Sequence, residues 1–143
     1  RRFVVMDDRL VIVDVDGTLA LFTGRHPFDW HRVHEDEPNE PVAELVRLLA
    51  RTGTEIVFLS GRDAVCRPAT EQWIAEHVID DPVVLMRPAG DNRSDREVKL
   101  ELFHGAIGDP ERVWFVLDDR DSVVSMWRDE LGLTCLQVAP GDF

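Results

Sequence analysis

The sequence predicts an α/β fold: a Rossmann-like three-layer sandwich with a five-stranded parallel sheet and a minimal cap. Short apolar runs, typical of buried strands, alternate along the chain with segments of helical periodicity. The connections are short, which favours right-handed crossovers and a parallel sheet covered by helices on both faces. Acids, a hydroxyl and cations follow the runs, and the strand ends of such sheets commonly carry the functional groups.

Five apolar runs are expected to form the strands. The first, RLVIVDV at residues 9–15, ends in acids and is followed by Gly17. Its nearly continuous apolar character suits a strand that is buried on both faces of a sheet. The other four runs lie at residues 55–59, 83–86, 112–117 and 134–138.

The segments between these runs predict four helices. Residues 41–52 place four apolar side chains on one helical face, and Gly53 ends this helix. Ser94 and Glu97 have capping-box spacing, so a helix is expected to begin there and to reach about residue 107. The other two helices are expected at about residues 64–77 and 121–131.

Length and composition indicate one domain. The 143 residues suffice for a single core, expected over residues 9–143 behind an N-terminal arm of residues 1–8. The net charge of −12 argues against a protein that coats nucleic acid through a broad basic surface. With no signal peptide and no apolar run near the roughly 20 residues that span a bilayer, we expect a cytoplasmic protein without membrane association. Cys66 and Cys135 lack metal-binding spacing, which suits buried thiols in a reducing compartment.

The first predicted strand ends in DVDGT, which places two acids at its carboxyl end. Gly17 allows a sharp turn, so Asp16 can be carried towards the same site as Asp14. One carboxylate can attack a phosphorus atom while the other protonates the departing oxygen. A DxD pair alone is a weak signal, because acids at strand ends are common, and it gains weight from the other strand ends.

A second pair of acids follows the fourth predicted strand. Asp118 and Asp119 offer hard oxygen ligands that, together with Asp14, suit Mg²⁺. A cation is needed there because a carboxylate that attacks a phosphate dianion meets charge repulsion. The sequence therefore predicts Mg²⁺ as the cofactor.

Further strand ends supply groups that bind a phosphoryl group. Arg62 and Lys99 can place positive charge where the transition state concentrates negative charge. Ser60 and the backbone amides near Gly17 and Gly61 can donate hydrogen bonds to phosphoryl oxygens. Chance assembly of all these groups at successive strand ends is improbable.

The motifs DVDGT, SGR, Lys99 and DDRD resemble those of the haloacid dehalogenase superfamily of phosphotransferases. Longer segments resemble more closely the phosphatase domain of bacteriophage-type polynucleotide kinase/phosphatase. These segments include GRHPFDWHRVHEDEP, MRPAGDNRSDREVKLELF and LTCLQVAPGDF. The likeness runs from about residue 10 to residue 143 with few visible gaps.

The resemblance implies a role for each matching residue. Asp14 would be the nucleophile that forms an aspartyl-phosphate, and Asp16 the general acid and later the general base. Mg²⁺ would be held by Asp14, the main-chain carbonyl of Asp16, and the Asp118–Asp119 pair, with the direct ligand of that pair left open.

The same resemblance implies phosphate contacts and two supporting residues. Arg25 would point towards the substrate, and Asp95 would orient Lys99. The residues expected to contact the transferred phosphate are Thr18, Ser60, Arg62 and Lys99.

The resemblance also suggests partners. No phosphate-binding loop of the type GxxxxGK followed by Ser or Thr occurs in the chain, so a kinase or ligase domain would lie outside it. A phage-encoded protein would work in the cytoplasm of the host cell. DNA or RNA preference and the oligomeric state stay open.

The stretch between the first strand and the first helix is only about twenty residues long, too short for a large cap domain. An uncovered site admits a bulky polymer end. This stretch contains Phe22, Arg25, Phe28 and Trp30, which are expected either to stack on a terminal base or ribose or to form a small apolar plug that holds the flap down. His26, His31 and His34 suit solvated side chains better than a zinc site.

The favoured hypothesis is a polynucleotide 3′-phosphatase that acts on DNA or RNA ends in end healing and repair. Two alternatives differ in substrate or in class. One is a phosphomonoesterase for small nucleotides or sugar phosphates. The other is a non-catalytic module that binds phosphorylated ends.

Overall fold

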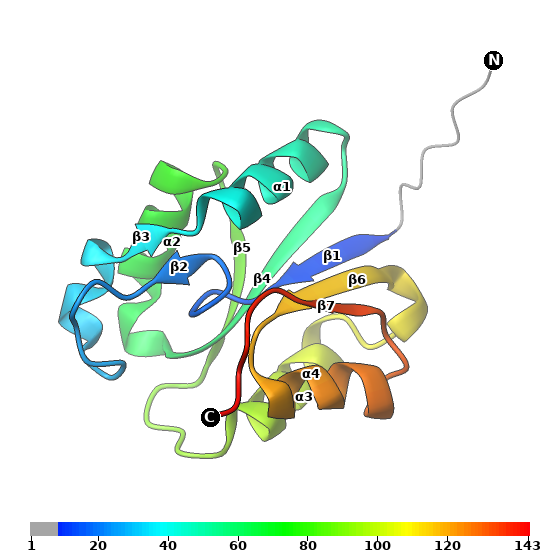
Figure 1. Cartoon of the computed structure of the whole chain (residues 1–143). Coiled ribbons are helices and arrows are strands. Elements are labelled where there is room, and N and C mark those ends of the chain that lie inside the picture. Colours follow the sequence, from blue (N-terminus) through cyan, green and yellow to red (C-terminus); the bar gives the residue numbers. More distant parts are fainter. Residues whose placement is uncertain (1–8) are drawn as a thin grey trace.

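The computed structural model describes residues 9–143, and the expected arm at residues 1–8 lies outside the described residues. The main strands are β1 (Leu10–Val13), β4 (Glu55–Asp63), β5 (Val83–Arg87), β6 (Val113–Asp118) and β7 (Cys135–Gln137). They form one parallel sheet in the order β5-β4-β1-β6-β7 (Figure 1). The predicted five-stranded parallel sheet is confirmed.

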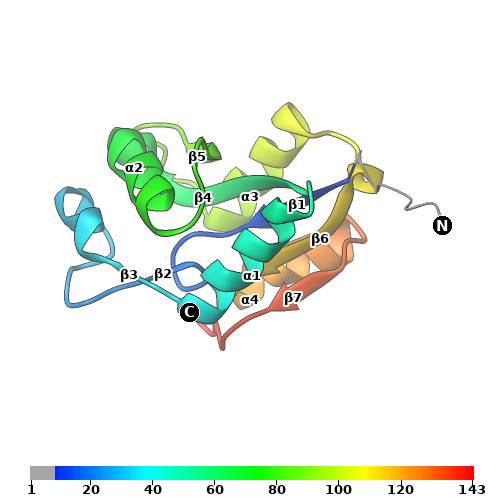
Figure 2. The same cartoon turned by 90° about the horizontal axis from the view of Figure 1, so that it is seen from above.

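Helices cover both faces of this sheet. α1 (Glu40–Arg51) and α2 (Arg67–His77) lie on one face, and α3 (Asp95–Ala106) and α4 (Asp121–Ser125) lie on the other (Figures 1 and 2). Successive residues of β1 contribute alternately to two hydrophobic cores, and each is at most 1% exposed. A central strand between two helical layers must be apolar on both faces, which explains the continuous run in the sequence.

Two of the predicted helices differ in detail. A 3₁₀ turn at Ala64–Cys66 precedes α2, because Asp63 accepts a 2.8 Å hydrogen bond from the Val65 amide and caps the turn. α4 continues as a π-helical turn at Met126–Glu130, and the Trp127 side chain in this wider turn is fully buried. The predicted start of α3 is confirmed, since Ser94 Oγ accepts a 3.3 Å hydrogen bond from the Glu97 amide.

The strand order creates a topological switch point between β1 and β6. The chain runs outward from β1 through β4 to β5, then returns to the other side of β1 with β6 and β7. Crossovers therefore leave these two strands in opposite directions, which opens a crevice at their carboxyl ends. There the Asp14 amide donates a 2.9 Å hydrogen bond to the Leu117 carbonyl, so Asp14 lies beside the end of β6.

The cap is minimal, as predicted. It consists of β2 (Ala20–Leu21), the 3₁₀ helix η1 (Trp30–Glu35) and β3 (Glu37–Pro38), with β2 and β3 paired antiparallel. In Figure 2 this small flap projects to one side of the sheet next to α2. None of the helices in residues 9–143 is long and apolar enough to cross a bilayer.

Candidate active site

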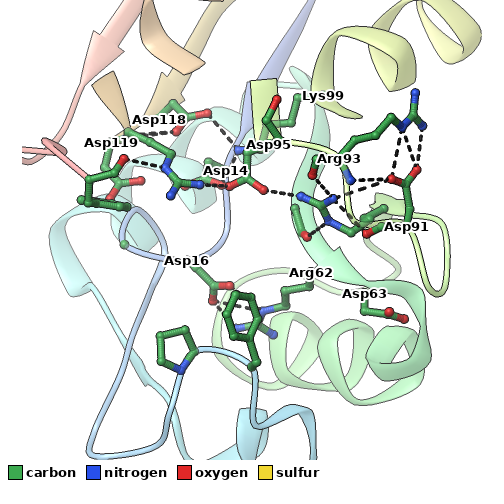
Figure 3. Close-up of a pocket in the computed structure, with 18 of the residues that line it drawn as sticks. Asp14, Asp16, Arg62, Asp63, Asp91, Arg93, Asp95, Lys99, Asp118 and Asp119 are labelled. Atoms are coloured by element: carbon green, nitrogen blue, oxygen red, sulfur yellow. Dashed lines mark hydrogen bonds and ion pairs between the residues drawn. The ribbon is translucent and has the colours of Figure 1, made fainter. Parts of the chain in front are cut away.

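A cavity of about 700 Å³ lies at the carboxyl ends of β1, β4 and β6 (Figure 3). Eight of the eleven residues predicted to act in catalysis, substrate binding or metal binding line it: Asp14, Asp16, Gly61, Arg62, Asp95, Lys99, Asp118 and Asp119. Three others are buried and do not line it: Thr18, Arg25 and Ser60. Segments far apart in the sequence thus meet at one site.

Lys99 joins the two central strands. Its ammonium donates hydrogen bonds of 2.7 Å to Asp14 Oδ1 and 3.1 Å to Asp118 Oδ2. Burial alone would lower the pKa of Lys99, but the carboxylates of Asp118 and Asp14 outweigh it and raise that pKa. Lys99 therefore keeps its positive charge in a buried position.

Asp14, Asp118 and Asp119 form a buried carboxylate triad, in which one oxygen atom from each residue lies within 4.8 Å of the other two. Burial and the charges of Asp118 and Asp119 raise the pKa of Asp14 well above its usual range, although Lys99 opposes the shift. Burial also raises the pKa of Asp119. Three acids facing one ammonium leave excess negative charge and hard oxygen donors, so these residues fit Mg²⁺.

The two acids of the pair after β6 differ in their free lone pairs. Asp118 Oδ1 accepts from the Asp119 and Arg120 amides, and Oδ2 accepts from Lys99 and from Trp127 Nε1. Its oxygen atoms are therefore fully occupied by donors from the protein. Asp119 Oδ1, by contrast, accepts a long 3.4 Å hydrogen bond from the Thr18 hydroxyl, and within residues 9–143 no main-chain amide of another residue, lysine or arginine bonds to its carboxylate. Asp119 has more capacity left for a metal ion.

The loop after β1 brings the backbone against the triad. Gly17 has a φ of +81°, and a Cβ atom there would lie 2.2 Å from Asp119 Oδ2. Only glycine suits both this conformation and this close approach. Next to it, Thr18 donates a 2.8 Å hydrogen bond to Asp14 Oδ2, so its hydroxyl fixes the Asp14 carboxylate from behind the cavity wall.

Asp16 faces Arg62 rather than the carboxylate triad (Figure 3). Arg62 Nη2 donates a 2.6 Å hydrogen bond to Asp16 Oδ1, and Nε lies 3.0 Å from the same oxygen. The remaining guanidinium donor, Nη1, bonds to Thr70 at 2.9 Å. Ser60 Oγ accepts a 3.1 Å hydrogen bond from the Arg62 amide and so holds the backbone of this segment.

Asp36, which was not predicted as a site residue, connects the flap to the Asp16–Arg62 pair. Its carboxylate accepts from Arg25 Nε at 2.7 Å and from Arg62 Nη2 at 2.8 Å, and all three side chains are fully buried. The donors of Arg25 face Asp36, carbonyls of the flap and, at 3.5 Å, Asp16 Oδ1, so its expected contact with the substrate stays a prediction. Asp36 lies among several acids in a polar loop, so nothing in the sequence distinguishes it.

Asp95 holds two arginines at the mouth of the cavity. Its two oxygens accept hydrogen bonds from Arg87 Nη2 at 2.5 Å and from Arg120 Nη1 at 2.6 Å. Burial would raise the pKa of Asp95, but the charges of Lys99, Arg120 and Arg87 lower it. Lys99 acts on Asp95 only through its charge, since its hydrogen bonds go to Asp14 and Asp118. Arg87 also donates to the Gly61 carbonyl at 2.7 Å.

The C-terminal segment supports the loop that carries Asp119. Gln137 Nε2 donates a 2.9 Å hydrogen bond to the Asp119 carbonyl. Gly141 packs so closely that a Cβ atom there would lie 1.8 Å from that same carbonyl oxygen. Arg120 Nε donates to the Phe143 carbonyl, and its guanidinium lies 4.9 Å from the centre of the Phe143 ring. These contacts fix the position of one acid of the triad.

Comparison with known proteins identifies relatives of the chain. The family model described as the polynucleotide kinase PNKP phosphatase domain matches residues 8–143. A protein of Autographa californica nuclear polyhedrosis virus, named for polynucleotide kinase and RNA ligase activities, is 40% identical over 124 residues. That match covers 85% of this chain and 18% of the viral protein.

Two solved structures resemble the chain, one at high and one at low sequence identity. A chain in a Pnkp1/Rnl/Hen1 RNA repair complex has a TM-score of 0.89 and 43% identity, with coverage of 94% of this chain and 43% of that chain. A class C acid phosphatase from Bacillus anthracis has a TM-score of 0.59 at 14% identity, covering 82% of this chain and 54% of its own. The second likeness shows a shared fold. The chain spans less than half of the length of its relatives at 40% identity or more.

Proposed function

Since this chain belongs to the family of polynucleotide kinase phosphatase domains, we propose that it hydrolyses 3′-phosphate ends of DNA or RNA during end healing. The observation that carries the proposal is the meeting of Asp14, Lys99 and the Asp118–Asp119 pair in one cavity, opposite the Asp16–Arg62 pair. This arrangement offers a nucleophile, a proton donor and positive charge around a volume that exceeds the needs of a phosphate group alone.

In the first step Asp14 acts as the nucleophile. One of its carboxylate oxygens attacks phosphorus, and the bond between phosphorus and the 3′-oxygen breaks as the new bond forms. Asp16 gives its proton to the departing 3′-oxygen, which leaves as a hydroxyl group. In the second step Asp16 accepts a proton from water, the water oxygen attacks phosphorus, and inorganic phosphate leaves Asp14.

Positive charge and hydrogen bonds stabilise the transferring group. Lys99 lies next to Asp14 and contributes a buried positive charge where the phosphoryl oxygens gather. Arg62 contributes its positive charge near the phosphoryl group, and its hydrogen bonds to Asp16 keep the general acid close to the leaving oxygen. Thr18 and Ser60 do not line the cavity. They orient Asp14 and the Arg62 backbone through hydrogen bonds.

Asp14 and Asp119 would hold Mg²⁺, and Asp118 would keep Lys99 and Trp127 in place around them. The ion supplies charge neutralisation, which lets a carboxylate approach a phosphate dianion. Kinase, ligase and other end-processing activities would reside in polypeptide outside this chain, as the names of its relatives suggest.

The test is phosphate release from a 3′-phosphorylated oligonucleotide with and without Mg²⁺. Asp14→Asn should lower kcat by at least about 10³-fold, and Asp16→Asn by about 10² to 10⁴-fold. Asp142→Asn is a matched control, because Asp142 is exposed and lies outside the triad. A wild-type protein that leaves 3′-phosphates intact, or that prefers a free 3′-mononucleotide, would reject the polynucleotide assignment.

A further inference from the structure

Phe28 is an aromatic residue placed where the fold does not need it. With 73% of its surface exposed, it is the most exposed of the large apolar residues described between residues 9 and 143. It nevertheless lines the cavity that holds Asp14 and Lys99. A large apolar side chain at the mouth of a charged cavity is more informative than one on an open surface.

The other aromatics of the flap have structural partners. Phe22 lies under the Arg25 guanidinium, which sits 4.3 Å from its ring centre. Trp30 is partly buried and packs against the core shared with α1 and α2. Both also line the cavity, and Phe22 is 42% exposed, but these contacts give the two residues a role in holding the flap. Phe28 has no such role, because most of its surface faces solvent.

Two neighbouring rings contact Phe28. The Trp30 ring contacts it in a T-shaped arrangement with centroids 6.0 Å apart, and the His26 ring lies at 5.6 Å. The Phe28 amide also donates a 3.2 Å hydrogen bond to His26 Nδ1. A ring fixed in this way binds a second ring at a low cost in conformational entropy.

We infer that Phe28 is the stacking platform for the base of the nucleotide that carries the 3′-phosphate. This inference rests on the proposed function. The cavity of about 700 Å³ is within the size range of ligand sites, with room for a nucleoside beside its phosphate. Stacking depends on the face of a base rather than its edges, so Phe28 accepts ends of any sequence. It gives the site a preference for nucleotide ends over other phosphomonoesters.

A cycle of two changes tests the inference. Wild type and Phe28→Ala are compared on two 3′-phosphorylated oligonucleotides, one with a normal terminal base and one with an abasic terminal sugar. We expect Phe28→Ala to raise KM about tenfold on the normal end. Its effect on the abasic end should be less than about twofold, because the stacking partner is already missing. Phe28→Trp should restore the KM for the normal end.

Controls separate this inference from the proposed function. Trp114→Ala removes an aromatic ring of 42% exposure that lies outside the cavity, and it should leave both KM values unchanged. If the wild-type enzyme is active and Phe28→Ala changes KM equally on the normal and the abasic end, or changes neither, the stacking role alone is overturned. A wild-type enzyme inert on every 3′-phosphorylated end would overturn the proposed function and this inference with it.

Discussion

Lys99 and Asp14 lie 85 positions apart in the chain, and the Lys99 ammonium donates a 2.7 Å hydrogen bond to the Asp14 carboxylate. Both side chains are at least 93% buried. The contact joins the first turns of α3 to the carboxyl end of β1. In the chain, β4 and β5 lie between these two elements. A buried charge without a partner would cost several kcal/mol, so each residue requires the other.

The triad predicts different effects for its two neighbouring acids. Asp119→Asn should weaken Mg²⁺ binding by at least about tenfold in isothermal titration calorimetry, because it removes an acid with free lone pairs. Asp118→Asn should instead lower the melting temperature even without Mg²⁺, since Lys99 and Trp127 lose their shared acceptor. Equal losses of Mg²⁺ affinity without a difference in stability would contradict the assignment.

Magnesium should also stabilise the folded protein. An ion that binds the native triad and not the unfolded chain raises the free energy of unfolding by about 2.7 kcal/mol at 100 times its Kd. Thermal melts in EDTA and in Mg²⁺ measure this effect, which should disappear in Asp119→Asn and persist in Asp142→Asn. An identical melting temperature with and without Mg²⁺ in the wild type would show that the triad does not hold the ion.

Asp36 predicts a large stability effect away from the triad. Asp36→Asn leaves Arg25 and Arg62 with less compensation in a fully buried network, and should cost about 3 kcal/mol in urea unfolding. Glu35→Gln, one position earlier, breaks an exposed pair with Arg32 and should lower the free energy of unfolding far less, because solvent screens that pair. Similar values for the two variants would mean that the network does not anchor the flap.

Cys135 predicts an alkaline loss of stability. Burial raises the pKa of this thiol to about 12 from an ordinary value of 9.0, so the folded state keeps the thiol proton longer than the unfolded chain does. The resulting stabilisation is complete below pH 9 and declines above it, by up to about 1.4 kcal/mol per pH unit. The chain has no Tyr and one Lys, so few other groups titrate there. Urea unfolding between pH 8 and pH 10 gives the free energy of unfolding as a function of pH. This free energy should fall less steeply with rising pH in Cys135→Ala than in the wild type, and an equally steep fall would contradict the prediction.

The part of the site set by strand ends could be predicted from the sequence. Asp14 follows the first apolar run, and Asp118 ends the fourth. A parallel sheet with a switch point brings the carboxyl ends of these two strands together. Lys99 follows a capping box, which fixed its place in the first turns of a helix.

Other contacts depend on tertiary structure and could not be predicted. Asp36 gains its role only when the flap folds onto Arg62, more than twenty positions later in the chain. Asp95 was expected to orient Lys99, yet its hydrogen bonds go to arginines in two separate loops. The short β2–β3 pairing involves two residues from each strand and carries no periodicity.

Chemical trapping of the phosphorylated protein would identify the nucleophile. The enzyme is mixed with an oligonucleotide whose 3′-phosphate is radiolabelled, quenched in acid within one turnover, and digested for peptide mapping. We expect transient label on the peptide that contains Asp14, no label in Asp14→Asn, and a longer-lived label in Asp16→Asn. Rapid phosphate release with no label on the protein, or label on a residue other than Asp14, would contradict the assignment of Asp14 as the nucleophile.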